Sequence, residues 1–132
     1  MSGVDIILPT FNCEQYVKET LDSIISQSFE NWKLIIIDDA SKDSTVKLIA
    51  GYLRDKRINF FQLKKNKGAG FCRNFGLRNS KSEYVAFIDS DDIWEKKKLS
   101  NQINFMQTNN YHFTYTNYSA FRYSKGKEIC KE

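Results

Sequence analysis

Three carboxylates follow one short apolar segment of the chain. Residues 84–88 (YVAFI) are predicted to form a buried strand, and they run directly into Asp89, Ser90, Asp91 and Asp92. Acids at the end of a buried strand are costly unless they meet water, a cation or hydrogen-bond donors. We therefore expect them at the carboxyl end of the strand, on the rim of a sheet, where open α/β sheets bind ligands.

Carboxylates two residues apart suit a hard divalent cation. Asp89 and Asp91 offer the oxygen ligands that Mg²⁺ and Mn²⁺ take in proteins. Such an ion usually keeps some of its water and shares phosphate oxygens with a substrate. A D-x-D pattern is also typical of a solvated turn, so the pattern alone leaves this alternative open. Asp92 is expected to shape the turn or to cap the following helix.

Two other predicted strands also end in polar groups. The strand over residues 4–8 is expected to stop at Pro9, which cannot donate to a sheet, and Thr10, Phe11 and Asn12 follow. A continuous β-branched segment, residues 34–37 (LIII), is typical of a strand covered on both faces, and it runs into residues 38–39 (DD).

The positions of these strand ends predict one shared site. The carboxyl ends of parallel strands lie at the same edge of a sheet, so residues 9–12, 38–39 and 89–91 are expected to converge. A single carboxylate such as Asp39 suits a ribose hydroxyl or a base N–H. Asp38 and Asp39 followed by Ser41 are equally typical of a helix-capping turn.

The basic loop before the third predicted helix is a weaker signal. It contains Gly68 and Gly70, and Arg73 follows, whose planar guanidinium could face a diphosphate. Arg73 could equally be a surface helix residue. The loop is not G-x-G-x-x-G and does not follow the first strand, so the pattern argues against a Rossmann dinucleotide site.

Apolar periodicity predicts the elements that must position these groups. A first helix is expected to begin at residue 12 or 13 and to end near residue 29, with Val17, Leu21, Ile24 and Ile25 on its apolar face. Further helices are expected over residues 46–53, 71–78 and 99–106, and further strands over residues 58–63, 111–116 and 118–123, with a turn at 124–127. The alternation predicts an α/β fold, a mostly parallel sheet between two layers of helices.

Composition limits the class of protein. The chain has 132 residues, 41% hydrophobic and 27% charged, which predicts one domain with its own core over residues 1–132. No apolar run reaches the ~20 residues that span a bilayer, and the N-terminus lacks the features of a signal peptide, so a cytoplasmic protein is expected. Three scattered cysteines predict neither a disulfide framework nor a zinc site.

The net charge of +4 includes lysine groups at residues 64–67 and 96–98. Such groups are usually solvated, but they also suit anionic ligands or an anionic membrane surface. The basic residues are not interleaved with aromatics as a stacking platform would require, so a nucleic-acid partner is not expected.

Taken in order, five segments resemble the N-terminal, nucleotide-sugar-binding half of family 2 glycosyltransferases, which have the GT-A fold. The segments are residues 7–12 (ILPTFN), 26–29 (SQSF) with Trp32, 36–45 (IIDDASKDST), 66–76 (NKGAGFCRNFG) and 83–94 (EYVAFIDSDDIW). The resemblance covers nearly the whole chain, and five segments in the right order are far more specific than any one of them.

The resemblance implies a site and a reaction. The implied nucleotide-sugar-binding residues are Pro9, Thr10, Phe11, Asn12, Asp38, Asp39, Arg73, Asp89, Ser90 and Asp91. Residues 9–11 would line the base and ribose pocket, Asp39 would hydrogen-bond the uracil or its ribose, and Arg73 would face the diphosphate. Asp91 would be the more direct ligand of Mn²⁺ or Mg²⁺, and Asp89 would lie nearer the ribose.

The implied enzyme transfers sugar with inversion, from a UDP-sugar donor to a glycan or lipid-linked acceptor. Bacterial-type surface polysaccharide synthesis, at the inner face of the cell membrane, is the expectation for such enzymes. The sequence departs from the family pattern in one respect: the general base is expected beyond Glu132, and neither Glu128 nor Glu132 matches it. We therefore expect a donor-binding part that lacks the acceptor-binding half.

Two alternatives remain. One is a non-catalytic nucleotide-sugar-binding module, which would share the same binding site. The other is a haloacid-dehalogenase-type phosphatase, which also uses an apolar strand followed by D-x-D, although there the pattern follows the first strand.

Overall fold

The computed structural model describes residues 2–124 and 127–130. The chain divides into two compact units, Met1–Ser100 and Asn101–Glu132, and each unit is described by itself.

The first unit is built on a four-stranded parallel sheet. Its strands are β1 (Val4–Thr10), β2 (Trp32–Asp38), β3 (Ile58–Gln62) and β4 (Tyr84–Phe87), in the order β3-β2-β1-β4. Every pairing in this sheet is parallel. The predicted α/β class and parallel sheet are therefore confirmed.

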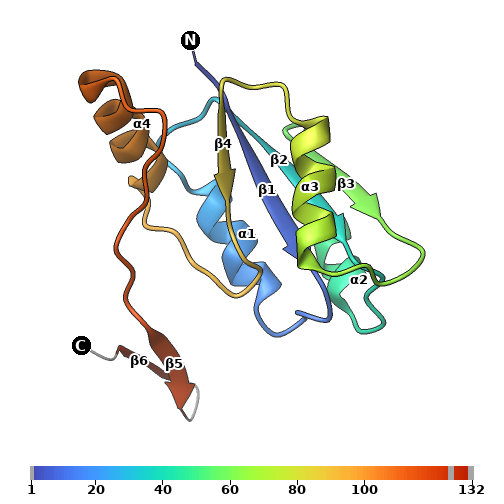
Figure 1. The fold of residues 1–132 in the computed structure, drawn as a ribbon. Helices are drawn as coiled ribbons and strands as arrows, with labels where there is room; N and C mark the ends of the chain where they lie inside the picture. The colour runs from blue at the N-terminus through green and yellow to red at the C-terminus, as the bar shows by residue number, and fades with distance from the viewer. Residues whose placement is uncertain (1, 125–126, 131–132) are drawn as a thin grey trace. The chain divides into compact units, whose positions relative to one another are not determined.

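Helices cover both faces of this sheet. The chain steps from β1 to β2 to β3 through α1 (Val17–Ile25) and α2 (Thr45–Ala50), then crosses back to β4 through α3 (Ala69–Asn79). Right-handed crossovers place α1 and α2 on one face and α3 on the other, as Figure 1 shows. The direction of winding reverses between β1 and β4, and crevices at such reversals are the usual ligand sites of open α/β sheets.

The prediction that Pro9 ends the first strand is wrong. β1 continues to Thr10, and Pro9 is in register with Ile37 of β2. The backbone groups of even-numbered residues in β1 form their hydrogen bonds on the β2 side of the strand. There the carbonyl of Thr10 accepts the N–H of Asp39. Pro9 therefore faces the β4 side, where pairing has ended at Ile7 with Phe87, so its missing N–H costs no ladder bond.

Helix α1 begins later than the periodicity predicted. Asn12 has φ of +45°, in the left-handed region, which a right-handed helix cannot include. The N–H groups of Tyr16 and Val17 both donate to the carbonyl of Cys13, which forms a turn before the helix. Val17, Leu21 and Ile24 are fully buried, whereas Ile25 is exposed.

The second unit holds most of α4 (Lys98–Asn109) and a hairpin of β5 (Phe121–Ser124) and β6 (Lys127–Cys130). The predicted strand over residues 111–116 is wrong, because residues 111–120 form no regular element. The alternating aromatics of this segment are solvent-exposed, and alternation cannot make a strand without a partner to complete the ladder. Within the predicted turn at 124–127, residues 125–126 lie outside the described residues.

Gly76 sets how closely α3 approaches the sheet. A Cβ atom at this position would lie 2.6 Å from Cγ2 of Ile7 and 3.2 Å from Cδ1 of Ile37. Both isoleucines are fully buried, and the branched Ile7 has little rotamer freedom with which to move away. The missing side chain therefore allows α3 to pack directly on β1 and β2.

Replacing Gly76 by Ala is expected to lower the free energy of unfolding by about 2 kcal/mol, because the added methyl group overpacks the core. Gly70 is the matched control. It lies in the same helix, and a Cβ there would meet nothing within 4 Å. Gly70→Ala should be neutral or stabilise by up to about 1 kcal/mol through helix propensity. Denaturant unfolding measures both, and equal effects of the two substitutions would contradict the packing role of Gly76.

Candidate functional site

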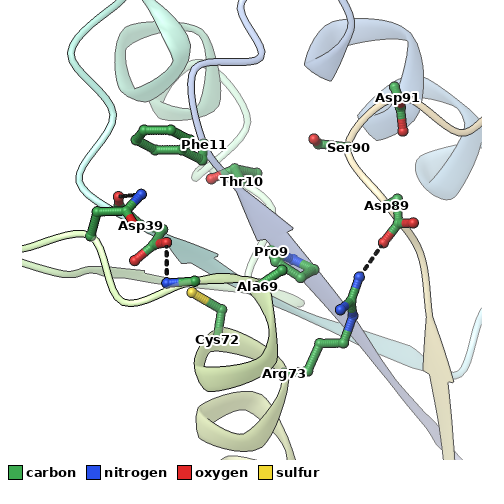
Figure 2. Close-up of a pocket in the computed structure, with 12 residues that line it drawn as sticks. Pro9, Thr10, Phe11, Asp39, Ala69, Cys72, Arg73, Asp89, Ser90 and Asp91 are labelled. Atoms are coloured by element: carbon green, nitrogen blue, oxygen red, sulfur yellow. Dashed lines mark hydrogen bonds and ion pairs between the residues drawn. The ribbon is translucent and has the colours of Figure 1, made fainter.

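A pocket of about 460 Å³ opens at the carboxyl edge of the sheet, where β1 and β4 lie side by side. It is lined by Pro9, Thr10, Phe11, Asp39, Asn66, Gly68, Ala69, Cys72, Arg73, Asp89, Ser90 and Asp91. Figure 2 shows Asp39 on one side of the pocket and the loop that carries Asp89 and Asp91 on the other. Three predicted strand ends therefore do converge, although they are far apart in the sequence.

The end of β1 and the first residue after it line the pocket, and they include one exposed aromatic ring. Thr10 is buried, and its Oγ1 donates to Oδ1 of Asp38 over 2.9 Å. Phe11 is 48% exposed at the pocket, so its ring face is accessible to a planar ligand.

Asp38 and Asn12 do not line this pocket. The fully buried carboxylate of Asp38 accepts three hydrogen bonds, one from Thr10 and two from the backbone and hydroxyl of Ser41. Oδ1 of Asn12 accepts the N–H of Lys42, and the Asn12 N–H donates to Ser41 Oγ. These two side chains hold the loops after β1 and β2 together, and their contact with a nucleotide sugar stays a prediction.

Asp39 anchors the basic loop to the site. Its carboxylate, 3% exposed, accepts the backbone N–H of Lys67 over 2.7 Å and of Gly68 over 2.8 Å. Gly68 has φ of +91°, a conformation that favours glycine, and α3 begins at the next residue. Asp39 thus fixes the entry to α3 and also lines the pocket.

Arg73 and Asp89 form an ion pair across the pocket, 2.7 Å from Nη2 to Oδ1 (Figure 2). Both side chains are well exposed, at 38% and 57% of their surfaces. Exposed ion pairs contribute little stability, so an anionic ligand could replace Asp89 as the partner of Arg73 at low cost.

Asp91 is the available carboxylate of the acidic loop, residues 89–92. It is exposed, and among the described residues its side chain forms no hydrogen bond or ion pair. Asp92 lies outside the pocket, where its N–H closes a turn onto the carbonyl of Asp89. Burial, and then the charges of Asp89 and Asp91, raise the pKa of Asp92. Asp92 shapes the turn and does not cap α4, since the Leu99 N–H at the start of that helix donates to Gln27 Oε1.

Four residues line the pocket that the sequence patterns do not identify as site residues. Gly68 ends the basic loop and Ala69 begins α3, and the glycines of this stretch, which resemble those of a nucleotide loop, are the signal that could have found them. Asn66 and Cys72 lie in the segment 66–76 that carries part of the family resemblance, but nothing in that pattern marks them as pocket residues. Burial, and then the nearby carboxylate of Asp39, raise the pKa of the Cys72 thiol to about 11, so it stays neutral and packs in the pocket wall.

In the part of the chain that the structure describes, no group of three or more His, Cys, Asp or Glu side chains could hold a metal ion. Across the same residues, no helix is long and apolar enough to cross a membrane.

The chain belongs to glycosyl transferase family 2, whose family model matches residues 5–129. This membership decides against the phosphatase alternative. It also confirms the family that the five sequence segments indicate.

The relatives are bacterial glycosyltransferases. The chain is 42% identical over 118 residues to WfaP of Escherichia coli, a UDP-Glc:α-D-GlcNAc-diphosphoundecaprenol β-1,3-glucosyltransferase, covering 89% of this chain and 47% of WfaP. It is 40% identical over 117 residues to TuaG of Bacillus subtilis, which is assigned by its name to glycosyl transfer in teichuronic acid biosynthesis. This match covers 88% of this chain and 46% of TuaG. The chain thus spans about half the length of these curated relatives.

A solved structure shares the fold. S. aureus TarS 1–349 in complex with UDP-GlcNAc is 33% identical, with a TM-score of 0.77, over 82% of this chain and 32% of the TarS chain. The neighbouring structures establish the GT-A class of fold for this part of the protein.

Proposed function

We propose that this chain is the nucleotide-sugar-binding part of a metal-dependent, inverting glycosyltransferase that uses a UDP-sugar. The observation that carries the proposal is the pocket at the reversal between β1 and β4, which joins an exposed aromatic ring, a buried carboxylate, an arginine and two further carboxylates. Family membership and the UDP-GlcNAc complex of TarS support the choice of donor.

Each side of the pocket suits one part of a UDP-sugar. Phe11 would lie against the uracil ring, and Asp39 would accept a hydrogen bond from the base or the ribose. Arg73 would turn from Asp89 to the diphosphate, because its planar fork can contact two phosphate oxygens at once.

The acidic loop fits a divalent cation. Two carboxylates from one exposed loop provide hard oxygen donors, and the other ligands of Mn²⁺ or Mg²⁺ would be water and diphosphate oxygens. Asp91, whose carboxylate is available, would bind the ion directly, with Asp89 beside it or nearer the ribose. A bound ion would neutralise the charge that develops on the departing UDP.

In the complete enzyme, an acceptor hydroxyl would attack the anomeric carbon from the face opposite UDP while a carboxylate base takes its proton. No residue of the pocket is assigned to that base. The name of TuaG supports a role in bacterial surface polysaccharide synthesis, and the name of WfaP supports a lipid-linked acceptor. A reaction at the inner face of the membrane is part of the same proposal.

Titration calorimetry with UDP, GDP, CDP and uridine tests the proposal, each in Mn²⁺, in Mg²⁺ and in chelator. UDP is expected to bind most tightly, and by about tenfold or more over the other ligands, because only UDP presents both uracil and diphosphate. Equal UDP affinity in chelator would contradict the metal dependence, and a preference for GDP would contradict a UDP-sugar as the donor. The alternative of a non-catalytic module predicts the same binding, and sugar transfer by the full-length protein would exclude it.

A further inference from the structure

Helix α1 carries a buried polar stripe beside its apolar one, and the stripe continues just past the end of the helix. Thr20, Ser23 and Gln27 are exposed by only 0%, 7% and 5%, and their spacing of three and four residues places them on one side of the helix axis. At 100° per residue, this stripe lies roughly a quarter turn from the apolar stripe of residues 17, 21 and 24. Buried polar side chains need hydrogen-bond partners, so the question is what this stripe contacts.

Thr20 contacts the acidic loop itself. Its Oγ1 lies 3.0 Å from the carbonyl oxygen of Ser90 and 2.8 Å from that of Asp92. One hydroxyl proton is thus shared between two carbonyls on either side of Asp91. The position of the Asp91 Cα is therefore tied to α1 from both directions.

Ser23 and Gln27 hold the segment that follows. Ser23 Oγ accepts the N–H of Trp94, and Gln27 Nε2 donates to the carbonyl of Glu95 over 2.8 Å. Gln27 Oε1 then accepts the N–H of Leu99. Three side chains thus fasten residues 90–99 at five points.

Other contacts hold mainly the two ends of the segment: Ile88 donates its N–H to the carbonyl of Ile7, Asp89 pairs with Arg73, and the carbonyl of Lys96 accepts the N–H of Ser28. Residues 88–97 contain no helix or strand, and the loop's own backbone bond is the turn from Asp92 to Asp89. Asp89, Asp91 and Asp92 place three carboxylates within four residues, and like charges this close repel one another. A loop under this repulsion needs outside donors to keep one conformation.

We infer that Thr20, Ser23 and Gln27 are positioning residues, which fix the backbone of residues 90–99 so that the carboxylates of the acidic loop are pre-organised for a cation and a nucleoside diphosphate. The second part of this inference rests on the proposed function. The first part, that the stripe fixes the loop, concerns the protein without ligand and can be tested alone.

Thr20→Val is the sharpest test, because valine keeps the shape of threonine and replaces the hydroxyl donor by a methyl group. Thr20→Ser keeps the hydroxyl and serves as rescue. Ser82→Ala is the matched control: it also removes one hydroxyl donor, to Asp5 Oδ1, but at the opposite end of β4.

Amide hydrogen exchange of the unliganded protein measures how readily the acidic loop opens. Thr20→Val is expected to speed exchange at Asp92 and Trp94 by about tenfold, because a lost hydrogen bond lowers the cost of local opening. Ser82→Ala should leave these two amides unchanged, and Thr20→Ser should restore them. Unchanged exchange in Thr20→Val would overturn the inference.

Calorimetry with UDP and Mn²⁺ then measures how the opening of the loop affects nucleotide affinity. Thr20→Val is expected to weaken binding by about tenfold, with Thr20→Ser and Ser82→Ala within about threefold of wild type. Faster loop exchange with unchanged affinity would overturn the positioning role. Wild-type protein that fails to bind UDP would refute the proposed function instead, and the hydrogen-exchange result alone would then decide whether α1 fixes the loop.

Discussion

Replacing Asp91 by Asn is expected to weaken metal-dependent UDP binding by about 100-fold or more, because a neutral amide lacks the negative charge with which a carboxylate binds a hard cation. The fold should survive, since the Asp91 side chain is exposed and, within the described residues, forms no hydrogen bond that the substitution would break. Calorimetry in Mn²⁺ measures the affinity, and thermal unfolding without metal measures the fold.

Asp92→Asn is the control for Asp91. It removes the same charge from the same loop, one residue away, but outside the pocket. Because the pKa of Asp92 is raised, its charged form is disfavoured in the folded state, so the neutral substitution should not destabilise the protein. UDP affinity should change by about threefold or less. If Asp91→Asn bound UDP as wild type does, or if Asp92→Asn lost binding equally, the assignment of Asp91 would be wrong.

Replacing Asp5 by Ala is expected to cost about 3 kcal/mol of unfolding free energy. The carboxylate is buried in β1, at the end of the sheet opposite the pocket, and it accepts four hydrogen bonds. Two come from the Ser80 and Ser82 hydroxyls and two from the backbone N–H groups of Lys81 and Ser82. Alanine would leave all four donors without this acceptor, and denaturant unfolding would show the loss.

The same carboxylate predicts a pH dependence. Burial acts to raise the pKa of Asp5, but the hydrogen bonds from Ser82, Lys81 and Ser80 together outweigh it and lower the pKa below 3.8. A lowered pKa means that the ionised form stabilises the fold above pH 3.8, and that this stability is lost as pH falls through the folded-state pKa. Asp5→Ala should therefore flatten the acid limb of the stability profile.

Asp22→Ala is the control for Asp5. Asp22 also has two strong partners, Lys18 and Tyr52, each 2.7 Å away, but it lies on the surface of α1. Its loss should cost about 1 kcal/mol or less, because water replaces exposed partners. A cost at Asp5 no larger than that at Asp22 would show that the buried cluster does not stabilise the sheet.

The sequence alone determined the α/β class, the parallel sheet and the edge at which the site lies. Apolar segments such as 34–37 could be recognised as strands because burial on both faces requires continuous apolar residues. Polar groups at the ends of such strands must reach the rim, so the sequence by itself could bring Thr10, Asp39 and Asp91 together. The family is likewise visible in the order and spacing of its segments.

Only the tertiary structure decided which polar groups face the pocket. Asp38 and Asp39 are neighbours of the same type, yet Asp38 is used by Thr10 and Ser41 while Asp39 lines the pocket. Hydrogen-bond partners far apart in the chain make this difference, and no local pattern reports them. The strand predicted over residues 111–116 failed for a related reason, since alternation cannot show whether a partner strand is present.

The buried polar stripe on α1 is the clearest case of contacts that a local sequence pattern does not report. Periodicity marked Val17, Leu21 and Ile24 as the buried face, because only apolar residues signal burial in a sequence. Thr20 and Gln27 are buried as well, but a polar side chain in a sequence looks the same whether it meets water or a loop carbonyl. Packing of residues 90–99 against the helix decides which it meets, and that packing exists only in the folded chain.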